Sequence, residues 1–318
     1  MVASLHPMTP RYIAYDTTID RLNWPDAVEA LKQGHRLPRA QVGDVYLGES
    51  DGNLLSRGAW IKGLGFGVKS LTVFEDNPRQ GLPTIQGAML VFDARNGGLE
   101  AIIEGRLVTE IKTAADSVLG AQYLARPDSR HLLIVGGGTV ARSLIKAYCA
   151  VFPQLARISI WTRRAEQARE LAKAFAGPVT VEAVTDLAGV AGQADIISTA
   201  TLARAPILHG DWIRPGTHVD LIGAYTPEMR EADDVLMSRA AVHVDSRETT
   251  VHHIGELMTP IANGAMTEAD VLGDLYDLAA RDLPARRSDA EITVFKNGGG
   301  AHLDLMIARY IAENLPDT

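Results

Sequence analysis

A glycine-rich turn near the middle of the chain has the residue types and spacing to bind a dinucleotide. The apolar run His131–Val135 leads into Gly136-Gly-Gly138-Thr-Val-Ala141, and helix-like sequence follows. Gly136 would permit a tight turn, Gly138 would let a pyrophosphate approach the backbone, and Ala141 would let helix and strand pack closely. The helix N-terminus offers unpaired N–H groups to the phosphates. A second strand-like run, Arg157–Trp161, lies about 20 residues further on, where a βαβ unit places it. We therefore predict a nicotinamide or flavin enzyme rather than an ordinary glycine-rich turn.

The residues that follow this second run bear on the choice of dinucleotide. They are Thr162, Arg163 and Arg164. An NAD site usually has Asp or Glu here to hold both ribose hydroxyls, whereas a nearby arginine can accept the 2′-phosphate of NADP. This local rule favours NADP(H), although an arginine here could also stack on adenine or face solvent.

The composition is that of a soluble globular protein. Of 318 residues, 46% are hydrophobic and 22% are charged, and the length allows two domains. No apolar run reaches the roughly 18 residues that span a bilayer, and the N-terminus lacks the basic and apolar regions of a signal peptide. The net charge of −8 argues against nonspecific nucleic-acid binding. The one cysteine, Cys149, excludes an intramolecular disulfide and is expected in the core, so a cytoplasmic location is predicted.

The order of apolar runs predicts an α/β chain with two domains. Residues 1–128 are predicted to form a mixed α/β domain, and residues 129–300 alternate strands and helices as a Rossmann doubly wound sheet does. A helix over 303–315 is expected to pack back on the first domain, which residues 301–318 would complete. Asn23 and Pro25 are expected to begin a helix that reaches residue 33, and Asn96-Gly97 to form a hairpin turn. Strands are predicted at 60–61, 67–74, 88–93 and 99–104, then at 132–135, 158–161, 180–183, 196–199, 218–222 and 241–244, with helices at 109–125 and 165–175.

Several motifs, in order and at matching spacing, resemble the ornithine cyclodeaminase/mu-crystallin family. They are Gly67-Val-Lys69-Ser, Leu82-Pro-Thr84-Ile-Gln86-Gly87, Thr109-Glu-Ile-Lys112-Thr113-Ala-Ala, the glycine turn, the stretch from Gly216 to Glu231, and Thr293-Val-Phe-Lys296-Asn-Gly298. The resemblance extends from about Pro38 to Ala308. It implies a substrate-binding and dimerisation domain beside a Rossmann domain. It also implies hydride passage between a substrate α-carbon and nicotinamide, either in a lyase that cyclises ornithine or in reductases of imines.

Two departures from the family pattern bear on the reaction. Tyr225 stands where the cyclodeaminases carry a catalytic aspartate, and a phenol is a poor substitute for a carboxylate base at neutral pH. This counts against cyclodeamination. Lys112 stands where most members carry arginine, so the charge is kept but the planar bidentate fork is lost. The substrate is either held differently or the swap is neutral.

The resemblance implies roles for four cations of the first domain. Arg39 would bind the substrate α-carboxylate, and Lys112 would be a second contact to that carboxylate or to the cofactor. Lys69 would protonate or polarise the imine nitrogen, and burial beside these cations is expected to lower its pKa. Arg57 would take a second carboxylate of the substrate, unless it is an exposed turn residue. Further cations of unknown orientation are His35, Arg36 and His302.

The same resemblance predicts the cofactor contacts. The residues expected to contact the dinucleotide are Thr84, Gln86, Thr113, Gly136, Gly138, Thr139, Val140, Thr162, Arg163, Arg164, Thr199, Ala200, Thr201, Ile222, Gly223, Tyr225, Lys296, Asn297 and Gly298. Of these, Lys296 to Gly298 are expected to close over the nicotinamide ring. No metal is expected, because the pair His252-His253 lacks partner ligands at useful spacing.

The predicted function is reduction of a 2-imino acid to an L-amino acid. The segment that begins at Lys112 and the stretch near Arg57 are similar to those of bacterial iminosuccinate reductases, which implies reduction of iminosuccinate to L-aspartate in glyoxylate assimilation. By this resemblance NAD(H) is favoured over NADP(H), against the local rule for Arg163 and Arg164. The alternatives are a reductase of cyclic imines such as pyrroline- or piperideine-2-carboxylate, an ornithine cyclodeaminase, and a non-catalytic binding protein. The predicted partners are a small imino acid and a second copy of the chain, with the active site in a cleft between the domains.

Overall fold

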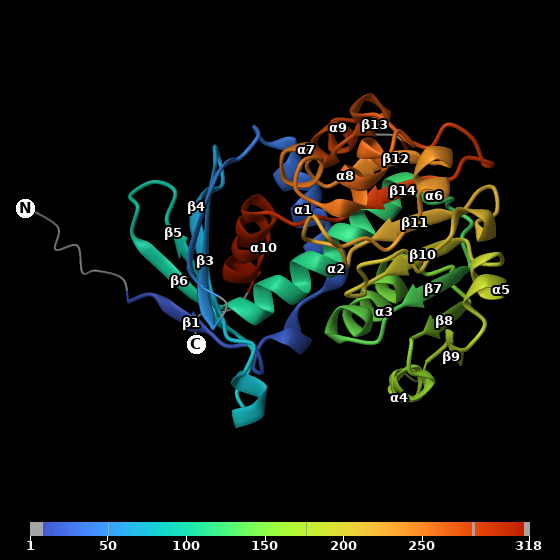
Figure 1. Ribbon diagram of the computed structural model, residues 1–318. Coiled ribbons are helices and arrows are strands. Elements are labelled where there is room, and N and C mark those ends of the chain that lie inside the picture. The colour runs from blue at the N-terminus through green and yellow to red at the C-terminus, as the bar shows by residue number, and fades with distance from the viewer. Residues whose placement is uncertain (1–8, 50, 176, 282–283, 315–318) are drawn as a thin grey trace, which may run out of the picture. The chain divides into compact units, whose positions relative to one another are not determined.

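The computed structural model describes residues 9–49, 51–175, 177–281 and 284–314. Its internal contacts divide the chain into two compact units (Figure 1). Unit 1 comprises Met1–Lys112 and Gly300–Thr318, and unit 2 comprises Thr113–Gly299. The division falls inside helix α2 (Gly105–Leu124), whereas the predicted domain boundary at residue 128 follows that helix. Two predictions fall outside the described residues. They are the lack of a signal peptide at the N-terminus and the helix end at residue 315.

Unit 1 is built on one sheet covered by the last helix of the chain. The sheet order is β1 (Arg11–Ile13), β6 (Leu99–Glu104), β5 (Ile85–Phe92), β4 (Gly65–Val73), β3 (Gly52–Ile61) and β2 (Gln41–Glu49). Neighbouring strands are antiparallel except for the parallel pair β1 and β6. Helix α10 (Ala301–Asn314) contacts β2 to β5 and also helix α1 (Trp24–Arg36). Alternate strand residues such as Ile61, Val91 and Ile103 are fully buried and form the core of this layer.

The hairpin of β2 and β3 is longer than the sequence indicated. Only residues 60–61 were expected as strand, but β3 begins at Gly52 and pairs along its length with β2. The apolar alternation that reveals a half-buried strand is missing, because every residue of β2 is exposed. The hairpin of β5 and β6 is confirmed, and Gly97 adopts the expected turn conformation with φ +73°.

Helix α1 begins near the predicted residue but is capped differently. Asn23 is its N-cap residue and Pro25 lies in its first turn, yet the Asn23 side chain makes no capping hydrogen bond. The Tyr310 hydroxyl of α10 instead accepts from the Asn23 backbone N–H at 3.0 Å and donates to its carbonyl at 2.9 Å. The start of α1 is therefore fixed by packing against α10.

Unit 2 has the predicted Rossmann fold. Its sheet is parallel throughout, in the order β13 (Val271–Gly273), β12 (Ala241–Val244), β14 (Thr293–Lys296), β11 (His218–Leu221), β10 (Ile196–Thr199), β7 (His131–Val135), β8 (Arg157–Trp161) and β9 (Thr180–Val184). The strand order reverses between β7 and β10, which is the switch point where such sheets bind ligands. Strands β13 and β14 were not predicted. They are three and four residues long.

The remaining helices of unit 2 are short connections around this sheet. They are α3 (Thr139–Val151), α4 (Ala165–Lys173), α5 (Leu187–Ala191), α6 (Asp234–Arg239), α7 (Arg247–Thr250), α8 (Gly255–Ala262) and α9 (Leu275–Ala279). None of the helices in the described residues is long and apolar enough to span a bilayer.

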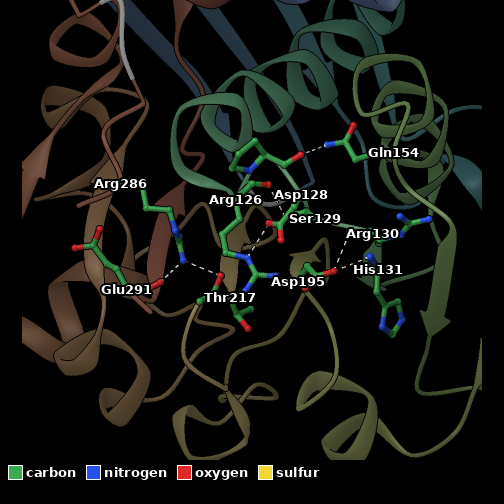
Figure 2. Close-up of polar contacts among 12 residues, drawn as sticks. Arg126, Asp128, Ser129, Arg130, His131, Gln154, Asp195, Thr217, Arg286 and Glu291 are labelled. Atoms are coloured by element: carbon green, nitrogen blue, oxygen red, sulfur yellow. Dashed lines mark hydrogen bonds and ion pairs between the residues drawn. The ribbon is translucent and has the colours of Figure 1, made fainter. Parts of the chain in front are cut away.

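The amino ends of the central strands in unit 2 are joined by Asp195 (Figure 2). Its carboxylate accepts hydrogen bonds from the backbone N–H groups of Arg130 and His131, at 2.8 and 3.0 Å, where β7 begins. It also pairs with the guanidinium groups of Arg126 and Arg214. Burial alone would raise the pKa of Asp195, but these donors keep it below its usual value. This network fixes the sheet at the end opposite the glycine turn.

Candidate active site

A cavity of about 380 Å³ lies in unit 2 at the carboxyl ends of three neighbouring strands. Its walls come from the loops after β7, β8 and β10, which the strand order places side by side. The lining residues are Gly136, Gly137, Gly138, Trp161, Thr162, Arg163, Arg164, Gln167, Ala200, Thr201, Leu202, Ala203 and Ile207. Predicted cofactor residues from three separate segments therefore meet at one cavity.

The glycine turn has the geometry that a dinucleotide needs. Gly136 has φ +139°, which side-chain-bearing residues rarely adopt, and a Cβ there would lie 2.5 Å from the Ala200 carbonyl oxygen. Gly138 is the N-cap residue of α3 and has no side chain to cap the helix. A Cβ at Gly138 would meet no heavy atom within 4 Å, so the space beside its backbone is open. Thr139 and Val140 form the first turn of α3, where backbone N–H groups have no intrahelical acceptor. The loop thus fits a pyrophosphate at the helix N-terminus.

The loop after β8 gives the cavity a positive wall. Thr162 is buried and donates from its hydroxyl to the Arg164 carbonyl at 2.6 Å, which folds the loop back on itself. Arg163 and Arg164 are exposed and line the cavity. Among the described residues that line the cavity, none is Asp or Glu. The wall therefore lacks the carboxylate that usually holds a ribose 2′-hydroxyl in NAD sites.

Glu231, which the sequence analysis did not single out as a site residue, holds the loops after β10 and β11. Its carboxylate accepts from the Thr199 hydroxyl at 2.7 Å, from the Thr201 N–H and hydroxyl at 2.8 and 2.7 Å, and from the Gly223 N–H at 2.6 Å. The Glu231 side chain is enclosed, and a Cβ on Gly223 would overlap it and the Thr201 backbone. The sequence signal that could have found Glu231 was its position at the end of the motif that begins at Gly216.

The predicted nicotinamide segment is a strand end whose polar groups bond within unit 2. Lys296 is fully buried, and its ammonium donates to the carbonyls of Leu221 and Asn297 at 2.9 and 2.7 Å. Burial lowers the pKa of Lys296, and nearby carboxylates oppose that shift. The Asn297 side chain donates to the Thr113 carbonyl at 3.0 Å, and the Gly298 N–H donates to the carboxylate of Asp245 at 2.8 Å. A role for these residues over the nicotinamide ring stays a prediction.

Two further predicted contacts near this segment differ in exposure. Ile222, directly after β11, is buried, whereas Tyr225 is 64% exposed. Close by in the sheet, Asp220 is fully buried and accepts from the Ser198 hydroxyl at 2.5 Å, and burial raises the pKa of Asp220 to about 7. Burial and the charge of Glu231 likewise raise the pKa of Glu256 to about 7. The carboxyl end of this sheet thus contains buried acids that titrate near neutrality.

Unit 1 contains a buried ion pair at the predicted proton donor. The ammonium of Lys69, on β4, lies 2.6 Å from Oδ1 of Asp304 on α10, and both side chains are almost fully enclosed. The same ammonium donates to the Thr109 hydroxyl at 3.3 Å. Burial lowers the pKa of Lys69 as expected, and the Asp304 carboxylate opposes the shift. Sequence reasoning missed Asp304, since nothing near Lys69 in the chain points to it.

The other predicted cations of unit 1 surround this pair. The charges of Lys112 and Arg57 act on both Lys69 and Asp304. Arg57 lies directly opposite Lys69 in the pairing of β3 and β4, and its guanidinium also binds Asp44 on β2 at 2.8 Å. Arg39 is exposed in the segment just before β2, close enough for its charge to act on the buried imidazole of His302 on α10. The structure thus brings the four predicted substrate cations into one region of unit 1.

His302 and His35, predicted as further cations, are both buried, and the predicted charge of His302 was wrong. His302 is fully buried, and burial together with neighbouring cations holds its pKa well below the usual value, so it is neutral at pH 7. Its ring packs edge-on against the buried ring of His35, with centroids 5.6 Å apart.

Two of the predicted cofactor residues belong to unit 1. Thr84 lies just before β5 and is half-buried, and Gln86 lies on β5 and is exposed.

The two units offer different chemical groups. Unit 1 offers cations for a carboxylate and a buried ammonium for proton transfer, and unit 2 offers a dinucleotide cavity. The described residues contain no group of three or more His, Cys, Asp or Glu placed to hold a metal ion. The chemistry that the side chains support is acid-assisted reduction of a carboxylated substrate.

Comparisons with known proteins show a family and relatives that the chain resembles. The model of the ornithine cyclodeaminase/mu-crystallin family matches residues 40–318. A protein from Paracoccus denitrificans (strain Pd 1222), named Delta(1)-pyrroline-2-carboxylate reductase, is 62% identical over 304 residues, which cover 95% of this chain and 96% of that protein.

Solved structures agree with this fold over almost the whole chain. The iminosuccinate reductase of Paracoccus denitrificans in complex with NAD+ has a TM-score of 0.83 at 26% identity and covers 96% of each chain. An archaeal alanine dehydrogenase dimer with bound NAD has a TM-score of 0.87 at 26% identity, and the match covers 96% of this chain and 95% of that chain.

Proposed function

This chain belongs to the ornithine cyclodeaminase/mu-crystallin family, and on that basis we propose that it reduces the cyclic imine Delta(1)-pyrroline-2-carboxylate to L-proline. The observation that carries the proposal is the 62% identity, over nearly the full length of both chains, to the Paracoccus denitrificans protein of that name. The buried Lys69–Asp304 pair supports it, because reduction of C=N needs a proton donor.

The residues of unit 1 bind and protonate the substrate in this proposal. Arg39 and Lys112 hold the carboxylate on the imine carbon, which orients that carbon for attack. Lys69 gives a proton to the ring nitrogen as the C=N bond becomes a C–N single bond. A reduced nicotinamide, when bound, supplies the hydride that the imine carbon accepts. The cavity of unit 2 is the proposed site of that dinucleotide, with its phosphates at the N-terminus of α3.

Iminosuccinate is the second candidate substrate. Arg57 favours it, because a cation opposite Lys69 in the sheet could bind a distal carboxylate. The pairing of Arg57 with Asp44 at 2.8 Å weighs against it, since a distal carboxylate would have to displace an existing partner. The identity to the iminosuccinate reductase of Paracoccus denitrificans is 26%, compared with 62% to the pyrroline carboxylate reductase.

Cyclodeamination has less support than either reduction. The position of the cyclodeaminase aspartate is held by Tyr225, which is 64% exposed. An exposed phenol offers no carboxylate base near neutral pH.

The proposed cofactor is a nicotinamide dinucleotide. NAD(H) is supported by the solved relatives that carry NAD or NAD+. Acceptance of NADP(H) is supported by Arg163 and Arg164 at the cavity wall.

A homodimer is the proposed assembly. The archaeal relative is described as a dimer, and β2 exposes Val45, Tyr46 and Leu47 by more than half along an unpaired sheet edge. Light scattering after size-exclusion chromatography should give twice the 34.2 kDa chain mass. A cytoplasmic location stays a prediction.

A substrate panel tests the proposed reaction. Purified protein is assayed by oxidation of NADH and of NADPH with Delta(1)-pyrroline-2-carboxylate, with the six-membered piperideine-2-carboxylate, and with oxaloacetate plus ammonia as a source of iminosuccinate. The highest kcat/KM is expected with the five-membered cyclic imine. A preference for oxaloacetate plus ammonia would establish the second candidate. Release of ammonia and proline from ornithine would contradict both reductions.

A further inference from the structure

The last helix of the chain places a carboxylate against the proposed proton donor. Asp304 and Lys69 are 235 residues apart in sequence, and their side chains meet at 2.6 Å with relative exposures of 1% and 6%. The second oxygen of the carboxylate, Oδ2, is buried and has no hydrogen-bond donor among the described residues. Among the described residues, Lys69 is therefore the one side chain that forms an ion pair with Asp304.

The surroundings of the pair are otherwise positive or neutral. The charges of Lys112 on α2 and Arg57 on β3 both disfavour a protonated Lys69. On α10, His302 is neutral, and the ring of His35 on α1 packs against it. A buried ammonium among these groups would lose its proton readily without an adjacent anion.

The geometry also accounts for the hydrogen atoms of the ammonium. Of its three N–H bonds, one points to Asp304 and one to the Thr109 hydroxyl. The third N–H is then available for a substrate nitrogen. A carboxylate on one side and a hydroxyl on another fix the direction of that third bond.

Resting on the proposed imine reduction, we propose that Asp304 is a positioning residue that keeps Lys69 protonated and aims its third N–H at the imine nitrogen. In the reaction, the C=N π bond is reduced by two electrons from the nicotinamide. The proton on Lys69 passes to nitrogen, and the neutral amine of Lys69 takes a new proton from water. In this role Asp304 itself exchanges no proton and does not contact the substrate.

The pH profile of kcat/KM for Asp304→Asn tests this role. Asparagine has the same shape without the charge, so the alkaline limb, where Lys69 loses its proton, should move down by roughly 1–3 pH units, the effect of an opposite charge at this range. Asp304→Glu keeps the charge and should keep the alkaline limb of the wild type, even where the longer side chain lowers kcat/KM. Glu313→Gln, on an exposed position of the same helix, is the matched control and should leave the profile unchanged.

A titration without turnover separates this inference from the proposed function. Nuclear magnetic resonance of protein labelled with 13C at lysine Cε, with the Lys69 signal assigned by its loss in Lys69→Arg, gives the protonation of Lys69 directly. The Lys69 pKa should be lower in Asp304→Asn than in the wild type. An unchanged titration, or a uniform loss of kcat/KM at every pH, would overturn the role. If Asp304→Asn does not fold, a displaced alkaline limb in Asp304→Glu would overturn it as well. A wild type that reduces no imine refutes the proposed function alone.

Discussion

Alanine substitution at two glycines of the turn after β7 should separate the folding of unit 2 from its binding of a dinucleotide. Gly136 has φ +139°, and a Cβ there would lie 2.5 Å from the backbone oxygen of Ala200. Gly138 has φ −85°, and a Cβ there would have no heavy atom within 4 Å. The same chemical change therefore meets the protein backbone at one position and open space at the other.

The two variants should differ in magnitude and in kind. Gly136→Ala combines a backbone strain of roughly 1–3 kcal/mol with an overlap that costs about 1–3 kcal/mol more. At roughly 2–4 °C per kcal/mol, its unfolding temperature should fall by about 4–24 °C. Gly138→Ala should change the free energy of unfolding by about 1 kcal/mol or less, since alanine is only a poorer N-cap than glycine. Its methyl group, however, occupies the approach of a pyrophosphate, and one lost hydrogen bond to a charged group costs about 1.5–3 kcal/mol, roughly 10- to 150-fold in Kd.

Thermal unfolding followed by circular dichroism measures the first effect, and titration of NADH fluorescence measures the second. The wild type and both variants are compared in one buffer, and NADH is titrated well below each melting temperature. The reasoning is refuted if Gly138→Ala binds NADH as tightly as the wild type, or if the two variants melt at the same temperature.

Three further predictions concern charge. Replacing Arg163 and Arg164 together with serine should lower the ratio of kcat/KM for NADPH to that for NADH by roughly 10- to 100-fold, because two cations near a 2′-phosphate are lost; an unchanged ratio would place both arginines outside cofactor selection. Asp220→Asn should be more stable than the wild type at pH 8 but not at pH 4, because the folded pKa is raised from 3.8 to about 7. The stabilising contribution of the protonated Asp220 is fully present below about pH 4 and is lost as the pH rises through 7. At about 1.36 kcal/mol per pKa unit, the free energy of unfolding lost by the wild type is roughly 4 kcal/mol. Urea unfolding at the two pH values measures this difference, and equal differences would contradict it. Arg57→Ala should lower kcat/KM for a cyclic monocarboxylate imine less than about threefold, since its guanidinium binds Asp44; a loss above roughly 100-fold confined to oxaloacetate plus ammonia would favour iminosuccinate as substrate.

The Rossmann unit was largely predictable because its signals are local. The turn from Gly136 to Ala141 and the run at Arg157–Trp161 have fixed spacing within one βαβ unit. The buried strands are short apolar runs, and two of them, Ile196–Thr199 and Ala241–Val244, begin and end where they were predicted. The β2 strand was missed, because a strand with every residue exposed carries no apolar alternation.

The chain sequence by itself determined the types of residue available for chemistry: a glycine turn, a lysine at 69, and arginines after β8. Tertiary structure decided which charges meet. The pairing of Lys69 with Asp304 joins residues 235 positions apart, and Glu231 holds loops from two different strands. No spacing rule predicts such contacts, because they depend on how helix α10 and the strand loops pack, and burial then sets the pKa of each partner.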